Sequence, residues 1–164
     1  MPAKSLTSDQ VLSILAENPL RIAALTAGLA PAQLRAVPVL GEWSANDVLA
    51  HLRSCSDVWG GNIIGILAEE VPTLRGVNPR TWIKKTDYPE LEFRPSFSSY
   101  AAQRAGLLAA LRPLTPEGWS RTAMVTAYGQ AFPHTALFYA DKMARHEMTH
   151  VRQIETIVKA IRKE

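Results

Sequence analysis

The sequence predicts an all-α fold, a four-helix bundle with long crossover connections. Apolar residues recur at three- and four-residue intervals through most of the 164 residues, and no convincing run alternates apolar with polar residues as a half-buried strand does. Two long irregular stretches, 70–95 and 114–132, separate helical segments, so the bundle need not follow a simple up-and-down order. The length fits a single helical domain over residues 1–164.

The first helix is expected to begin after Thr7, whose side chain can cap the backbone, and to end before Pro31. Pro19 lies inside this segment. Because proline lacks an N–H and disfavours helical backbone at the preceding Asn18, we expect either a kink or two shorter helices there.

The second helix has the clearest start signal. Ser44 begins a capping-box pattern, after which helical spacing continues to about residue 69. A third helix is expected over residues 96–112. The fourth is expected over residues 133–161, with Pro133 at its first position, where a missing N–H is tolerated.

The composition indicates a cytoplasmic protein without a membrane or nucleic-acid partner. The net charge is only +3, and the basic residues are spread along the chain rather than gathered in one block. No apolar run approaches the roughly 18 residues of a membrane span, and the N-terminus lacks the apolar region of a signal peptide. The single cysteine, Cys55, excludes an internal disulfide and fits a reducing compartment.

Three of the four histidines fall at core-facing positions of the predicted helices. His146 and His150 lie one turn apart in the apolar stripe of the fourth helix, and His51 lies in that of the second. A single core histidine is more often a hydrogen-bonded structural residue. Burying three unpaired imidazoles is costly, however, and a shared cation offsets that cost. We therefore predict a divalent metal site of His51, His146 and His150; a plain bundle with core imidazoles is the alternative.

Residues 146–150 read HEMTH, which matches the H-E-x-x-H pattern of zinc peptidases. The longer form of that pattern places a glycine and a third histidine within the next six residues, and the segment after His150 contains neither. No strand pattern precedes the motif to hold an extended peptide. We therefore reject the peptidase and expect the third ligand upstream, at His51.

The segments GEWSANDVLAHL (41–52) and MARHEMTHVRQIE (143–155) together resemble the DinB/YfiT-like superfamily, the DNA-damage-inducible group of small metal-binding four-helix bundles. In that family a W-S-x-x-D-x-L-x-H-L segment supplies one histidine and an H-x-x-x-H pair on the last helix supplies two. These ligands fall on His51, His146 and His150. The resemblance extends over nearly the whole chain and includes a Tyr128-Gly129 turn before the last helix.

The resemblance implies a bacterial, stress-associated protein that binds Zn²⁺ or Ni²⁺ and uses it on a small-molecule substrate. Characterised relatives transfer or isomerise low-molecular-weight thiols of the mycothiol or bacillithiol type, so thiol transfer and metal-activated hydrolysis are both expected. A non-catalytic metal-binding bundle, in which the ion fastens the second and fourth helices, is the alternative. Bundles of this kind also pair, so a homodimer is possible.

Several residues beside the ligands have open roles. Glu147 is the candidate catalytic base or orienting group, and a solvated charge on the helix surface is its alternative. Gln153 could hydrogen-bond near the site. Cys55 is expected to be a small buried residue rather than a fourth ligand. His134 is expected to be a surface or capping residue, and basic residues in 70–95 either a rim for an anionic co-substrate or a solubilising loop.

Overall fold

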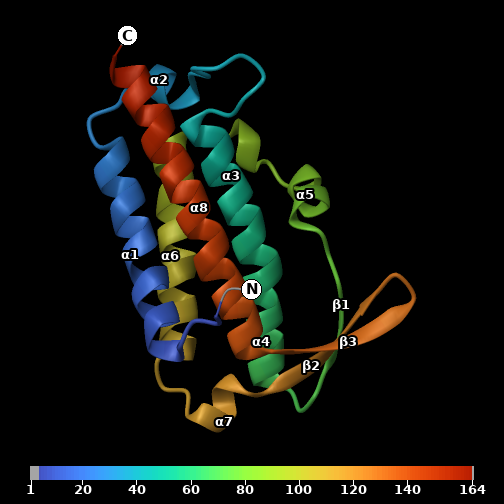
Figure 1. Ribbon diagram of the computed structural model, residues 1–164. Coiled ribbons are helices and arrows are strands. Elements are labelled where there is room, and N and C mark those ends of the chain that lie inside the picture. The colour runs from blue at the N-terminus through green and yellow to red at the C-terminus, as the bar shows by residue number, and fades with distance from the viewer. Residues whose placement is uncertain (1–3, 164) are drawn as a thin grey trace.

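The computed structural model describes residues 4–163 and places four long helical rods side by side (Figure 1). The first rod is α1 (Ser8–Thr26) and the third is α6 (Phe93–Leu111). The second joins α3 (Ala45–Cys55), a π-helical turn (Ser56–Gly60) and α4 (Gly61–Ala68); the fourth is α8 (Ala136–Arg162). Helices α6 and α8 each pack against both α1 and α3. The predicted four-helix bundle is confirmed.

Short elements fill the connections between the rods. They are the helices α2 (Pro31–Arg35), α5 (Pro79–Trp82) and α7 (Pro116–Trp119), the 3₁₀ turns Ile83–Lys85 and Tyr88–Glu90, and the strands β1 (Thr73–Arg75), β2 (Thr122–Ala127) and β3 (Gln130–Thr135). Within residues 4–163, no helix is long and apolar enough to cross a membrane.

The small sheet corrects the expectation that no strand would form. Strand β2 pairs parallel with β1 and antiparallel with β3, so the two long connections are hydrogen-bonded to each other. Tyr128 and Gly129 form the two-residue turn of the β2–β3 hairpin, with φ of 51° and 74°. Two successive positive φ values are the signature of a type I′ turn, whose twist suits a hairpin.

The fourth helix begins at Ala136, so its predicted start at Pro133 is wrong. Pro133 instead lies in β3, which is an edge strand of the sheet. An edge strand tolerates proline because the missing N–H need not join the ladder. Thr135 caps α8 in its place, its side chain accepting from the Phe138 N–H.

The first helix runs unbroken through Pro19, so the alternative of two shorter helices is wrong. Proline at this position leaves the carbonyl of Leu15, four residues earlier, without its helical donor. Arg104 on α6 supplies the replacement, its Nη1 donating to the Leu15 oxygen at 2.9 Å. A side chain of α6 therefore supplies the hydrogen bond that the Leu15 carbonyl of α1 loses to Pro19.

The same arginine forms a buried ion pair with Glu147 on α8. Both side chains are 3% exposed. Arg104 donates to the carboxylate with both terminal nitrogens, Nη1 at 2.8 Å from Oε1. Asn18 Nδ2 on α1 donates to Oε1 at 3.0 Å, and the Tyr100 hydroxyl on α6 donates to Oε2 at 3.0 Å. This polar network ties three rods together within the core.

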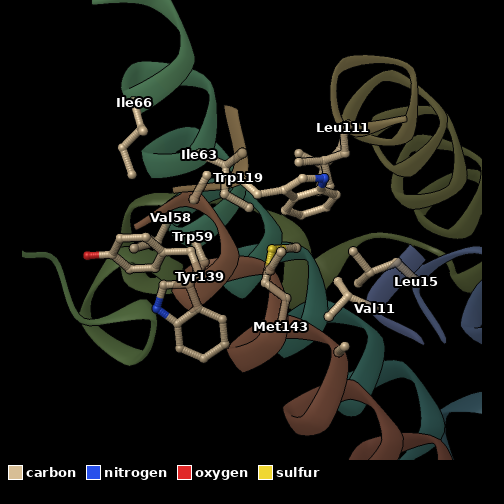
Figure 2. Close-up of a cluster of buried hydrophobic side chains, with 14 of the residues drawn as sticks. Val11, Leu15, Val58, Trp59, Ile63, Ile66, Leu111, Trp119, Tyr139 and Met143 are labelled. Atoms are coloured by element: carbon tan, nitrogen blue, oxygen red, sulfur yellow. The ribbon is translucent and has the colours of Figure 1, made fainter. Parts of the chain in front are cut away.

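Apolar clusters surround that network on both sides along the bundle. Figure 2 shows the cluster around Met143, which gathers side chains from all four rods and from α7. The labelled members are Val11, Leu15, Val58, Trp59, Ile63, Ile66, Leu111, Trp119, Tyr139 and Met143. A second cluster, which includes Leu49, Tyr100 and Ile154, fills the other half of the bundle.

We expect Arg104→Met to lower the free energy of unfolding by about 3–5 kcal/mol, because it leaves the Glu147 carboxylate buried and unpaired. Urea denaturation followed by circular dichroism measures the change. The double variant Arg104→Met/Glu147→Leu should regain part of the loss, since it removes both charges. Arg112→Met, at the exposed end of the same helix, is the control and should change stability by less than about 0.5 kcal/mol. Equal losses in the single variant and the control would contradict this account.

Candidate metal site

The structure brings the three predicted histidines together between α3 and α8. His146 Nε2 lies 3.2 Å from His51 Nε2 and 3.1 Å from His150 Nε2. Ligands on one tetrahedral ion with metal–nitrogen bonds of 2.0–2.1 Å are about 3.3–3.4 Å apart. The two contacts of His146 therefore already have nearly the length that a shared ion requires.

Local sequence explains why these rings meet. The Ser44 side chain accepts from the Asp47 N–H at 3.0 Å, and Asp47 accepts from the Ser44 N–H, so the capping box that starts α3 is formed. That start sets the rotation of α3 and places His51 on its inner face. On α8, the four-residue spacing of His146 and His150 puts both rings on one face.

All three imidazoles are neutral at neutral pH. Burial, reinforced by His150, lowers the pKa of His51 from 6.5 to about 4 and that of His146 likewise. Burial also lowers the pKa of His150. Neutral imidazole is the form that binds a metal, so the site favours a cation over a proton.

A neighbouring amide fixes the tautomer of one ring. His150 Nδ1 lies 2.8 Å from Gln153 Oε1, and because that oxygen only accepts, Nδ1 carries the proton. The Nε2 lone pair of His150 is then free to bind an ion. Such partners to the far nitrogen are usual for metal-binding histidines. His146 Nδ1, in contrast, is buried without a partner.

Two tryptophans enclose the rings. Trp43 stacks on His150 at 6.0 Å between centroids and meets His51 edge-on at 5.3 Å. Trp59, from the π-helical turn, meets His146 edge-on at 5.0 Å. No local pattern in the sequence places either indole against the histidines. They hold the rings and limit the entry of water.

A cleft of about 410 Å³ adjoins His51. It is lined by Trp43, Asp47, Ala50, His51, Arg80, Ile83 and Pro89. The Arg80 guanidinium lies 6.0 Å from the centre of the Trp43 ring, and its positive charge contributes to the lowered pKa of all three histidines. The cleft therefore offers an imidazole and a cation to a small anionic molecule.

Cys55 also reaches the cluster. Its Sγ lies 3.6 Å from His51 Nε2, and the donor atoms of His51, Cys55 and His146 all lie within 4.8 Å of one another. The thiol is buried, and burial raises its pKa to about 12. Cys55 thus joins His51 and His146 in a set of three donors, and His150 Nε2 lies beside that set through His146.

Glu147 points into the bundle core, where both carboxylate oxygens accept bonds from Arg104, Asn18 and Tyr100. The residue is 2% exposed, so it is not the solvated surface charge considered as its alternative role. Its engaged oxygens favour a structural role over the predicted catalytic one.

The remaining candidates lie elsewhere. His134 is in β3, stacked on Phe138 at 3.9 Å between ring centroids, rather than at the start of α8. Arg94 donates to the backbone carbonyls of Thr26 and Leu29, which makes it a structural tie between rods rather than part of a rim. Of the basic residues in 70–95, Arg80 is the one that lines the cleft beside His51.

Comparison with known proteins identifies the family. Residues 14–154 match the sequence pattern of the DinB superfamily. This chain belongs to the DinB superfamily. The solved structure of YfiT from Bacillus subtilis, described as a probable metal-dependent hydrolase with an unusual four-helix bundle topology, matches with a TM-score of 0.75 and 20% identity, over 97% of this chain and 91% of that one. No curated protein matches significantly. At this identity the likeness to YfiT shows a shared fold.

The lowered histidine pKa values predict how stability depends on pH. Between about pH 6.5 and 4 the unfolded state binds more protons than the native state, so stability of the metal-free protein falls as pH falls through that range. Chemical denaturation at a series of pH values measures the slope. The double variant His51→Ala/His146→Ala should show a shallower slope. Identical slopes would mean that these imidazoles do not titrate as described.

Gln153→Ala should weaken metal binding about 10- to 100-fold, because it removes the acceptor that sets the His150 tautomer. Competition against a chromophoric chelator measures the affinity. Gln153→Glu keeps an acceptor and should bind at least as tightly as Gln153→Ala. Arg152→Ala, at the exposed neighbouring position, is the control and should leave the affinity unchanged. A Gln153→Ala affinity equal to that of the control would remove this residue from the site.

Proposed function

We propose that this DinB-superfamily protein is a metal-dependent enzyme acting on a small molecule, with a divalent cation held by His51, His146 and His150. The observation that carries the proposal is that His146 Nε2 lies 3.1–3.2 Å from the Nε2 atoms of both His51 and His150. Three histidine ligands, with the remaining position exchangeable during turnover, suit a catalytic zinc site.

The donor chemistry fits a borderline cation. Imidazole nitrogens suit Zn²⁺ and Ni²⁺, whereas Mg²⁺ and Ca²⁺ prefer oxygen. The His150–Gln153 bond and the enclosing indoles match the surroundings expected of such a site. When bound, the ion would lower the pKa of a water or a thiol and polarise a substrate oxygen.

The chain's own residues define how a substrate would be received. The cleft beside His51 has the size of a small-molecule site, and Trp43 gives it a flat apolar wall. Arg80 at its rim would hold an anionic group of the substrate. A carboxylate- or phosphate-bearing substrate therefore fits better than a cationic one.

Hydrolysis and low-molecular-weight thiol transfer are the two reactions that we propose for this site. The description of YfiT as a probable metal-dependent hydrolase supports the first. The cationic Arg80 beside the imidazoles supports the second, because a neighbouring positive charge favours the thiolate form of a thiol co-substrate. Turnover of activated esters and of thiol adducts by metal-loaded protein separates the two reactions.

A non-catalytic metal-binding bundle is the second candidate function. The observation that favours it is Cys55, a fourth potential donor inside the cluster. In that role the ion would mainly fasten α3 to α8. Removal of the ion would then change stability, while no substrate of either class would be turned over.

Untagged wild-type protein should carry close to one equivalent of Zn²⁺ or Ni²⁺ by elemental mass spectrometry, and His51→Ala should lose most of it. His134→Ala is the matched control, because this fourth histidine lies in β3 outside the cluster, and it should keep the metal. If wild-type protein is empty and does not bind either ion when offered it, the metal site and the enzyme proposal both fail.

A further inference from the structure

Each of the two facing helices carries two metal donors four residues apart. On α8 these are His146 and His150, and on α3 they are His51 and Cys55. Side chains at this spacing lie on one helical face, one turn apart. Cys55 is 3% exposed and is the only cysteine of the chain, and its sulfur points to the nitrogen of His51 that already faces His146.

We propose that the Cys55 thiolate is the fourth ligand of the ion held by His51, His146 and His150. The inference rests on the metal site of the proposed function and assigns its remaining position to a protein donor. The resulting tetrahedral set has three nitrogens and one sulfur.

The distances suit that set. With zinc bonds of 2.0–2.1 Å to nitrogen and 2.3 Å to sulfur, a tetrahedral site has a nitrogen–sulfur edge of about 3.6 Å. The distance from Cys55 Sγ to His51 Nε2 is 3.6 Å, and the two nitrogen–nitrogen contacts are 3.1 and 3.2 Å. These three edges fit the set, and the donor atoms of His51, Cys55 and His146, which lie within 4.8 Å of one another, would draw closer around the ion.

The alternative is a plain hydrogen bond from a buried thiol to His51. In that bond the thiol of Cys55 would donate its proton to the Nε2 lone pair of His51. The same lone pair is needed to bind the ion. Binding of the ion resolves the conflict: the S–H bond breaks, its proton leaves to solvent, and a sulfur–metal bond forms. No oxidant or reductant takes part in this step.

The π-helical turn that follows Cys55 brings an aromatic side chain to the same cluster. Residue 55 is the last of α3, and the widened turn Ser56–Gly60 follows directly. This turn carries Trp59 against His146. Single π-helical turns inside α-helices occur frequently at functional sites. Here the turn lets one rod present a sulfur donor and an aromatic wall to the same cluster.

A sulfur ligand changes how the site would work. Four protein donors leave no open position in the resting protein, so a substrate must either displace Cys55 or bind as a fifth ligand. Thiolate also raises the preference for Zn²⁺ over oxygen-seeking ions. Cys55 would then serve to retain the ion while no substrate is bound, and catalysis would begin only when a substrate reaches the ion.

Titration with Co²⁺ tests the assignment, because a cobalt–thiolate bond produces an intense charge-transfer band in the near ultraviolet. The reductant must contain no sulfur, so that Cys55 is the only thiol present. In the wild type we expect the band to grow up to one equivalent. In Cys55→Ala and Cys55→Ser it should vanish, while the weaker visible bands of bound Co²⁺ persist.

Two outcomes would overturn the inference, and they can be distinguished. Stoichiometric visible bands without the charge-transfer band in wild type would keep the three-histidine site and remove Cys55 from it. Absence of any Co²⁺ or Zn²⁺ binding would remove both. If the variants do not fold, X-ray absorption at the zinc edge of wild-type protein decides alone, through the presence or absence of one sulfur at about 2.3 Å.

Discussion

The buried pair of Arg104 and Glu147 is the interaction on which the rest of this bundle depends. Each oxygen of the Glu147 carboxylate accepts two hydrogen bonds from side chains of α1 and α6. These bonds fix both the rotation of α8 about its axis and its position along that axis. With Glu147 directed inward, the adjacent His146 is necessarily turned towards α3. The charge pair in the core thereby orients the helix face that carries His146 and His150, a role of specificity rather than of net stabilisation.

This arrangement gives the HEMTH string a different meaning from the one it has in peptidases. The histidines and the glutamate serve two separate surfaces of a single helix, one facing α3 and the other facing α1 and α6. A sequence can therefore match the peptidase motif without forming a peptidase site. The motif specifies only the spacing of the residues, and not which side chains each of them contacts in the fold.

Much of the fold and the proximity of the three histidines could be predicted from the sequence, because both rest on local spacing. The Ser44 cap, the helical stripes and the pair His146–His150 are all visible within one element. The hairpin was missed since only Ala123 and Val125 alternate as buried residues in β2, too short a pattern to outweigh helical spacing. The partners of Glu147 and the stacking of Trp43 depend on how separate rods are rotated, which no local pattern encodes.

The ligands of the cluster are far apart along the chain: His51 and His146 are separated by 95 residues. During synthesis His51 and Cys55 leave the ribosome long before α8 exists, so at that stage two donors at most are present. The site is complete only once residue 150 has been made and α8 has docked. Binding of the proposed ion would therefore be a late event in synthesis, and a bound ion would report that α8 has docked.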